Sequence, residues 1–447
     1  MVMVVPFCGV RYNADKVGVL DSVFAPPYDV ISPQEQNELY EKNPYNVIRL
    51  ILSKGEGDEK YIEAAETLRR WIDEGVLIQD REPSIYPYYQ EFKENGKLVT
   101  RKGFIAAVRL EDFSSKKIIP HERTFAGPKL DRLKLTSACR ANLSPVFAIY
   151  SDPEGVVEKA IEDRLSKEPI VKAVSGDGVK NYLWRISDSD LLSQIRSRMS
   201  DSVLLIADGH HRYETALEYR NIQRKRFNAV SEDKDYEYVM MYLSRVEGEG
   251  LVIKPTHRVV KNLGSLDIED FLEKLNNKFK VKVVSGAVLP EPALSGAQFA
   301  PEGNKKFGSG GNKQFAPDGN KKPPFNEGIS TLNHQEFAIV TNDSDLIFKF
   351  SSKEPISVHY KNLGVMLLHG GVFGEVINEE EAGILYTKSV EEVVRLVRTG
   401  DYKIGFILPQ VRAKDLYEVA LSGEKMPHKT TYFYPKLLSG LVFHLLD

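Results

Sequence analysis

The sequence predicts a mixed α/β or α+β fold. Short apolar segments of strand length alternate with longer segments whose apolar residues recur at helical spacing. The composition, 42% hydrophobic and 28% charged, is that of a globular protein that buries a core. At roughly 100–200 residues per domain, the 447 residues suffice for several domains.

The first expected part covers residues 1–150. Ser32, followed by Pro33 and then by Glu35, predicts the start of a helix with a capping box. The other expected elements here are a helix within residues 57–75, a hairpin of strands 85–92 and 98–108 around Asn95-Gly96, and a strand over 145–150. A polar stretch, residues 120–132, separates the hairpin from the last strand.

The second expected part covers residues 151–290. Its clearest feature is the apolar run Val203–Ala207, which has the length of a strand. Asp208-Gly209 is typical of a turn, and helical spacing of apolar residues begins at His210.

Residues 291–328 form a third expected part, a low-complexity insertion. Gln298–Lys306 recurs with one change as Gln314–Lys322, and Gly, Pro, Asn and Lys dominate the segment. Such a composition buries too little apolar surface to offset its ordering entropy, so we expect a flexible loop. A basic partner-binding arm is the alternative.

The fourth expected part, residues 329–447, returns to globular patterning. The expected elements are a strand pair over 336–340 and 346–350, and helices 390–398 and 413–421 on either side of a strand over 404–408.

Charge and cysteine content exclude some classes of protein. The 60 Lys and Arg residues nearly balance the 63 Asp and Glu residues, which makes nucleic acid an unexpected main partner. Cys8 and Cys139 are too few for a disulfide framework or a four-cysteine zinc site. With no signal-like segment and no apolar run long enough to cross a membrane, the sequence favours a cytoplasmic protein without membrane contact.

The turn after the strand at 203–207 carries the strongest chemical signal. A strand that turns through Gly209 into a helix leaves backbone N–H groups unpaired at the positive end of the helix dipole, which suits a phosphate. His210, His211 and Arg212 add donors there. Asp208 has the wrong charge for phosphate, but it can hold Mg²⁺ or accept a proton from a hydroxyl.

Two plainer interpretations of this turn stay open. It can be a helix cap with two surface histidines. It can also be a zinc site, although adjacent histidines on a helix point about 100° apart and share one ion poorly.

Other polar residues are candidates for the same chemistry. Asp29 and Glu122 both lie in loop-like segments of the kind that carry sites. Six further residues are candidates for a second anion site: His121, His257, Arg258, Lys429, Thr430 and Lys436.

Several blocks of the chain together resemble one family, the domain of unknown function (DUF) family 1015. The blocks lie at residues 24–31, 121–124, 128–133, 142–145, 207–216, 255–258 and 426–436. The block at 207–216 also resembles the phosphate-binding box of the ParB/sulfiredoxin-like superfamily. That resemblance implies a nucleotide-binding core with a mixed sheet, accompanied by a second α+β region.

The superfamily's members differ at this box. Sulfiredoxins need a cysteine where this chain has His210, and partition proteins carry a Gly-Glu-Arg-Arg version with a helix-turn-helix domain that we do not find here. Free-serine kinases carry Asp-Gly-His-His-Arg, the string found at Asp208–Arg212.

The resemblance to the kinases implies an activity. It implies transfer of phosphate from ATP or ADP, with Mg²⁺, to the hydroxyl of a small serine-like acceptor; CTP is an alternative nucleotide. Asp208 would be catalytic together with an upstream carboxylate, either Asp29 or Glu122. A nucleotide-gated ParB-like module that binds DNA or a partner, a non-catalytic interaction protein, and assembly as a homodimer stay open as alternatives.

Overall fold

The computed structural model describes residues 1–122, 126–228, 234–285, 332–342, 346–353, 363–427 and 429–446. The expected insertion at 291–328 lies outside the described residues. The described chain forms two compact units. The first contains residues 1–253, 412–426 and 433–447, and the second contains residues 254–411 and 427–432.

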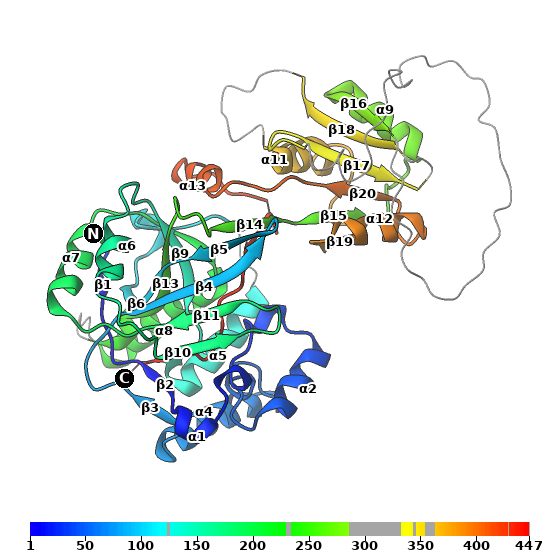
Figure 1. Ribbon diagram of the computed structural model, residues 1–447. Helices are drawn as coiled ribbons and strands as arrows, with labels where there is room; N and C mark the ends of the chain where they lie inside the picture. The colour runs from blue at the N-terminus through cyan, green and yellow to red at the C-terminus, as the bar shows by residue number, and fades with distance from the viewer. Residues whose placement is uncertain are drawn as a thin grey trace, which may run out of the picture. The chain divides into compact units, whose positions relative to one another are not determined.

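A ten-stranded mixed sheet is the centre of the first unit (Figure 1). Its path runs β10-β11-β4-β6-β13-β9-β12-β7, with β1 paired to β6 and β5 paired to β4. The strands are β1 (Val4–Val5), β4 (Tyr86–Glu94), β5 (Lys97–Arg101), β6 (Phe104–Arg109), β7 (Ile118–Pro120), β9 (Val146–Tyr150), β10 (Val171–Val174), β11 (Lys180–Leu183), β12 (Leu204–Asp208) and β13 (Tyr238–Arg245). The pairs β12–β7 and β13–β9 are parallel, whereas the other pairs are antiparallel.

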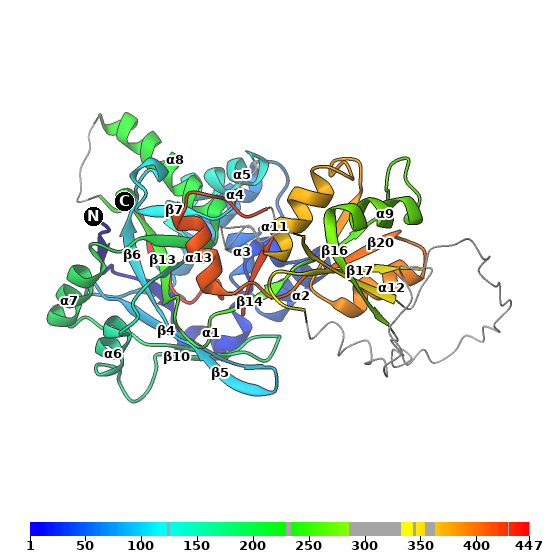
Figure 2. The same cartoon turned by 90° about the horizontal axis from the view of Figure 1, so that it is seen from above.

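Two small sheets accompany it in the same unit: β2 (Val10–Tyr12) pairs with β3 (Leu77–Gln79), and β8 (Ala141–Asn142) pairs with β22 (His444–Leu445). The helices of this unit are α1 (Ala14–Val17), α2 (Pro33–Lys42), α3 (Ile48–Ile51), α4 (Glu59–Asp73), α5 (Ala126–Cys139), α6 (Val156–Glu162), α7 (Ser189–Met199), α8 (His210–Phe227) and α13 (Ala413–Leu421). Figure 2 shows α4, α5 and α8 as neighbours, and α5 contacts both of the others.

The expected elements of the N-terminal part are confirmed. At α2 the Ser32 hydroxyl accepts from the Glu35 amide, and the Glu35 carboxylate accepts from the Ser32 amide, which is a complete capping box. The hairpin forms around Asn95 and Gly96, both at positive φ as this tight turn requires. The expected strand 98–108 is interrupted at Lys102 and Gly103, so that β4 pairs with both β5 and β6.

The core of the first unit lies between its sheet and its helices. Buried apolar residues from β6, β9, β12 and β13 pack with residues of α6, α7 and α8 in one cluster. The polar stretch at 120–132 is partly helical, because α5 begins at Ala126.

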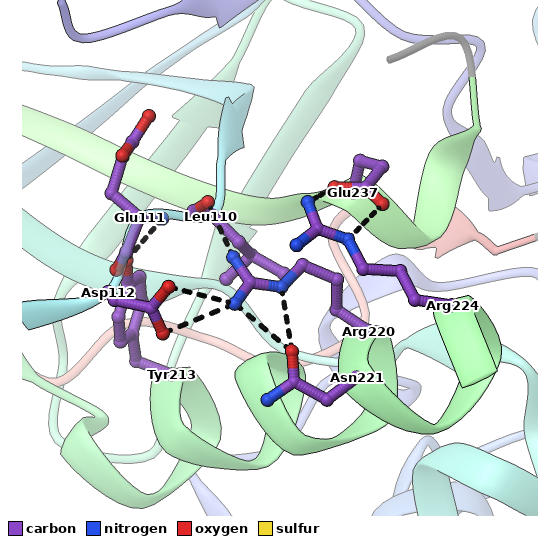
Figure 3. A network of polar contacts seen from close by, with 8 residues as sticks. All are labelled: Leu110, Glu111, Asp112, Tyr213, Arg220, Asn221, Arg224 and Glu237. Atoms are coloured by element: carbon purple, nitrogen blue, oxygen red, sulfur yellow. Dashed lines mark hydrogen bonds and ion pairs between the residues drawn. The ribbon is translucent and has the colours of Figure 1, made fainter. Parts of the chain in front are cut away.

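The second half of α8 is bound to the segments next to the sheet through the buried Arg220 and the partly exposed Arg224 (Figure 3). Arg220 donates to the Leu110 carbonyl at 2.8 Å and to Asp112, and Arg224 donates to Glu237 at 2.7 Å. These bonds link the helix to the segment after β6 and to the start of β13, and so fix the direction in which its first turn points.

The second unit contains a six-stranded antiparallel sheet in the order β16-β18-β17-β20-β15-β19. Its strands are β15 (His257–Val260), β16 (Phe279–Ser285), β17 (Phe337–Thr341), β18 (Leu346–Ser352), β19 (Ile384–Thr387) and β20 (Ile404–Ile407). Its helices are α9 (Ile268–Lys278), α11 (Gly364–Leu368), a π-helical turn (His369–Phe373) and α12 (Val390–Arg398). The expected strand pair at 336–350, the strand at 404–408 and the helix at 390–398 are confirmed.

The segments that link the units, β14 (Val252–Pro255) and β21 (Thr431–Tyr434), pair as a two-stranded sheet. The expected boundary at residue 150 falls at the end of β9, within the large sheet. The expected part 329–447 contributes to both units. None of the described helices is both long enough and apolar enough to cross a membrane.

Candidate functional site

The predicted strand–turn–helix at residues 203–216 is present. β12 ends at Asp208, after an irregularity in its pairing with β9 between Ile206 and Asp208. Gly209 follows at φ +87°, and α8 begins at His210. A Cβ on Gly209 would lie 2.8 Å from Arg212 Nε, so both its backbone conformation and its close approach to Arg212 require glycine.

Asp208 is held between two cations. Lys436 Nζ lies 2.7 Å from Oδ1, and Arg212 Nη2 lies 2.8 Å from Oδ2. Burial alone would raise the pKa of Asp208, but Lys436 and Arg212 outweigh burial and hold the pKa well below its ordinary value. The carboxylate is therefore ionised at neutral pH, and both of its oxygens are engaged.

A chain of two imidazoles and a carboxylate lies beside this ion pair. The His121 amide donates to His210 Nε2 at 3.4 Å, so this nitrogen carries no proton. The proton of His210 is therefore on Nδ1, which lies 3.3 Å from Glu122 Oε1. His210 is buried, and its hydrogen bonds direct it at Glu122.

His121 is buried and neutral. Its Nδ1 lies 2.7 Å from the Ile206 carbonyl, which can only accept, so Nδ1 is the protonated nitrogen. Burial and the adjacent His210 lower the pKa of His121 to about 4. The two rings meet edge to face with their centroids 4.6 Å apart. This candidate for the second anion site thus belongs to the site at the start of α8.

Both upstream carboxylate candidates act on His211. Burial lowers the pKa of this half-buried imidazole, while Glu214, Glu122 and Asp29 oppose the shift. Asp29 is exposed, in the short helical turn Tyr28–Val30. Asp29 and Glu122 therefore both remain candidates, because the charge of each influences an imidazole in the first turn of α8.

A small pocket of about 50 Å³ has Arg212 in its lining. The Arg132 guanidinium stacks over the Tyr28 ring at 3.9 Å, and both side chains line it. The remaining lining residues are Ile51, Leu135, Thr136, Ala141, Asn142, Leu143, Ser144, Val146, Arg212, Thr215, Ala216 and Val239. Residues from the blocks at 24–31, 128–133, 142–145 and 207–216 thus meet around one pocket.

The surroundings of Asp208 do not fit a resident metal ion. In the part of the chain that the structure describes, no group of three or more His, Cys, Asp or Glu side chains could hold one. Both oxygens of Asp208 already bind cations of the protein. The expected Mg²⁺ is therefore not assigned to protein ligands, and the zinc alternative has no ligand set among these residues.

Four candidates for the second anion site lie in the second unit. His257 is buried, accepts at Nδ1 from the Leu408 amide at 3.2 Å, and has its pKa lowered to about 4 by burial and by Arg258. Arg258 is buried over Tyr386 and donates to the Thr256 and Lys429 carbonyls. Thr430 donates to the Pro427 carbonyl at 2.6 Å.

The burial of two polar residues, Gln90 and Arg101, was not predicted from the sequence. They lie opposite each other on β4 and β5 and bind the backbone of residues 435 and 436. The available signal was weak: a polar residue within a strand pattern usually faces solvent.

Comparison with known proteins gives the class to which the chain belongs. Residues 4–365 match the family model described as "Protein of unknown function (DUF1015)", and the chain belongs to this family. A search of curated protein sequences found no match.

Three solved structures show distant similarity. A conserved hypothetical protein from Pyrococcus furiosus is 13% identical, with 72% of this chain and 89% of that chain covered and a TM-score of 0.30. A free serine kinase in complex with AMP is 12% identical, with 71% and 83% covered and a TM-score of 0.31. C-terminally truncated SbnI from Staphylococcus aureus is 11% identical, with 75% and 85% covered and a TM-score of 0.33.

Proposed function

We propose that the chain binds a nucleotide, ATP or ADP, at the turn Asp208–Arg212 and transfers a phosphoryl group to the hydroxyl of a small acceptor. The observation that carries the proposal is the clamp of Asp208 between Lys436 and Arg212 at the start of α8. The proposal includes a ParB/sulfiredoxin-like core in the first unit, as the block at 207–216 implies.

The phosphate-binding part of the proposal rests on donors and charge. Lys436 and Arg212 are mostly buried, and they present two positive charges against the one negative charge of Asp208. The first turn of α8 adds backbone N–H groups and the positive end of a helix dipole. An entering phosphate group would compete with Asp208 for both cations.

This competition provides a reason why the carboxylate becomes basic only when the nucleotide is bound. While Lys436 and Arg212 contact Asp208, its pKa is far below neutral and it is a poor proton acceptor. Once phosphate oxygens engage the same cations, the pKa of Asp208 rises towards its ordinary value. Mg²⁺ would arrive with the phosphates.

The transfer step makes one bond to phosphorus and breaks another. The acceptor hydroxyl oxygen forms a new bond to the terminal phosphorus, and the bond from that phosphorus to the bridging oxygen of the nucleotide breaks. The proton of the hydroxyl passes to a carboxylate, either Asp208 or one of the upstream candidates, Glu122 and Asp29. His210 holds Glu122 through Nδ1–H at 3.3 Å and would orient it for this role.

The pocket beside Arg212 is the proposed position of the acceptor. Its volume of about 50 Å³ is small; a cavity of about 150 Å³ is needed to enclose a benzene ring. The pocket thus favours the end of a small molecule over a nucleobase. Thr136, Asn142 and Ser144 line it among apolar residues, which suits a polar end group.

Product formation tests the proposal directly. The protein is incubated with ATP or ADP, Mg²⁺ and single hydroxyl compounds, serine first, and phosphomonoesters are followed by ³¹P nuclear magnetic resonance. We expect a new ester with the unmodified protein and with the surface control Asp163→Asn, and none with Asp208→Asn. Equal yields from Asp208→Asn and the unmodified protein would rule out a catalytic role for Asp208, and no ester with any acceptor would rule out the kinase.

A further inference from the structure

Two buried side chains hold the backbone that carries Lys436. Arg101 Nη2, at the end of β5, donates to the Pro435 carbonyl at 2.6 Å. Gln90 Nε2, on β4, donates to the Lys436 carbonyl at 3.0 Å. Gln90 and Arg101 are direct register partners, and their exposed fractions are 0% and 1%. Two adjacent carbonyls are thus bound by two neighbouring strands of the large sheet.

These two side chains are themselves fixed by a buried network. Arg101 Nη2 also donates to Gln90 Oε1, and Gln90 Nε2 also donates to Asn181 Oδ1 at 3.0 Å. The Tyr88 hydroxyl donates to the same Asn181 oxygen at 2.6 Å and accepts from the Leu438 amide at 3.4 Å. Strands β4, β5 and β11 therefore hold residues 435–438 from one side, which limits where the Lys436 side chain can reach.

The charge of Arg101 is unusual for such a position. Within the described chain no carboxylate forms an ion pair with it, and its guanidinium lies 4.9 Å from the centre of the Phe147 ring and 5.8 Å from that of Tyr242. Burial lowers the pKa of Arg101, while Tyr242, Tyr88 and, more weakly, Asp208 raise it. A buried cation without a close carboxylate destabilises the fold, so its presence calls for a role.

We propose that Arg101 and Gln90 are positioning residues that place the ammonium group of Lys436 against Asp208 for the binding of a multiply charged anion, a phosphate or polyphosphate group. The proposal rests on the proposed function for the nature of the ligand. Arg212 and Lys436 both pair with Asp208, and the Arg101 guanidinium binds the backbone next to Lys436, so three cations and one carboxylate gather here among the described residues. Such a group of cations suits an anion that carries more than one negative charge.

Gln90→Leu tests the positioning role, because it removes the bond to the Lys436 carbonyl without changing any charge. The first readout is the crystal structure of this variant, in which we expect Lys436 Nζ to leave hydrogen-bond distance of Asp208 Oδ1. The second readout is calorimetric binding of inorganic pyrophosphate. We expect Gln90→Leu to bind pyrophosphate about tenfold more weakly, the value for one misplaced charged hydrogen bond. When Gln90→Leu is combined with Lys436→Ala, we expect the double variant to bind less than twofold more weakly than Lys436→Ala alone.

Two more variants serve as controls. Arg101→Lys keeps the charge but cannot bind the Pro435 carbonyl and Gln90 in the same way, so we expect weaker pyrophosphate binding. Lys172→Ala changes an exposed lysine on β10 and should leave pyrophosphate binding unchanged. If Gln90→Leu weakens binding equally with and without Lys436, or if Lys436 stays on Asp208 in the variant structure, the positioning role is overturned.

The outcomes separate this inference from the proposed function. If the unmodified protein binds neither pyrophosphate nor a nucleotide, the proposed function and the anion class both fail, and the crystal structure still decides the positioning of Lys436. If pyrophosphate binds but no nucleotide does, the anion site stands and the kinase proposal fails.

Discussion

Lys436 and Asp208 lie 228 residues apart in the sequence, and Lys436 Nζ is 2.7 Å from Asp208 Oδ1. Arg212 occupies the other oxygen of the same carboxylate. The end of β12 therefore carries a fully paired carboxylate directly before the first turn of α8. Four predictions follow for single residues of this site and of the adjacent pocket.

Asp208→Asn should destabilise the protein in a pH-dependent way. Removing the charge leaves two mostly buried cations unpaired, which we expect to cost on the order of 3 kcal/mol at pH 7. The folded-state pKa of Asp208 is lowered, so its stabilising effect is present above the unfolded pKa of about 3.9 and is lost as the pH falls below that value. Urea unfolding at several pH values from 7 to 3 measures the free energy of unfolding of both proteins. A difference between them that stays constant with pH would contradict the prediction.

Gly209→Ala should disturb Arg212 as well as the backbone. The positive φ alone makes alanine unfavourable by about 1 kcal/mol, and the added Cβ would lie 2.8 Å from Arg212 Nε. Gly178→Ala is the matched control, because Gly178 also has positive φ but a Cβ added there would meet no atom within 4 Å. We expect the larger loss of stability, and loss of nucleotide binding, only for Gly209→Ala. Equal effects of the two variants would show that Arg212 is not displaced.

His121 should make stability fall as the pH is lowered from about 6.5 to 4. Its pKa is about 4 in the folded state, against about 6.5 when unfolded. The unfolded state then binds more protons in this window, which destabilises the fold by on the order of 3 kcal/mol at its lower end. His121→Gln should flatten this part of the stability profile. His257 titrates in the same window, so His257→Gln serves as comparison, and an unchanged slope in His121→Gln would contradict the account.

Ala216→Leu should block the acceptor pocket without affecting the nucleotide. Ala216 is buried and lines the pocket of about 50 Å³, which the larger side chain would largely fill. We expect ATP or ADP affinity within about twofold of the unmodified protein and at least tenfold lower acceptor-dependent turnover. Ala160→Leu on α6, away from the pocket, is the control. Full turnover in Ala216→Leu would place the acceptor elsewhere.

The sequence was sufficient for the elements whose signals are local. The capping box at Ser32, the Asn95-Gly96 hairpin and the strand–turn–helix around Gly209 each depend on a few adjacent residues, and each is present in the structure. Such features can be predicted because the residues that select the cap or turn are close to one another in the sequence.

The contacts that complete the candidate site could not be predicted in this way. The Lys436–Asp208 pair joins segments brought together by the large sheet and by the return of the chain after the second unit. Lys436 and Asp208 were each singled out as site candidates, but their pairing was not predicted. Arg101 gave no signal, because a single charged residue in a strand pattern does not reveal that it is buried.

Calorimetric titration with ADP and ATP tests the central claim most directly, on the unmodified protein, on Lys436→Ala and on the exposed control Lys172→Ala. The account predicts that the unmodified protein and Lys172→Ala bind at least one nucleotide equally well. It predicts that Lys436→Ala binds at least tenfold more weakly, as loss of a charged hydrogen bond to phosphate requires. Equal affinity of Lys436→Ala and Lys172→Ala, or no binding of ADP, ATP or CTP to the unmodified protein, would contradict it.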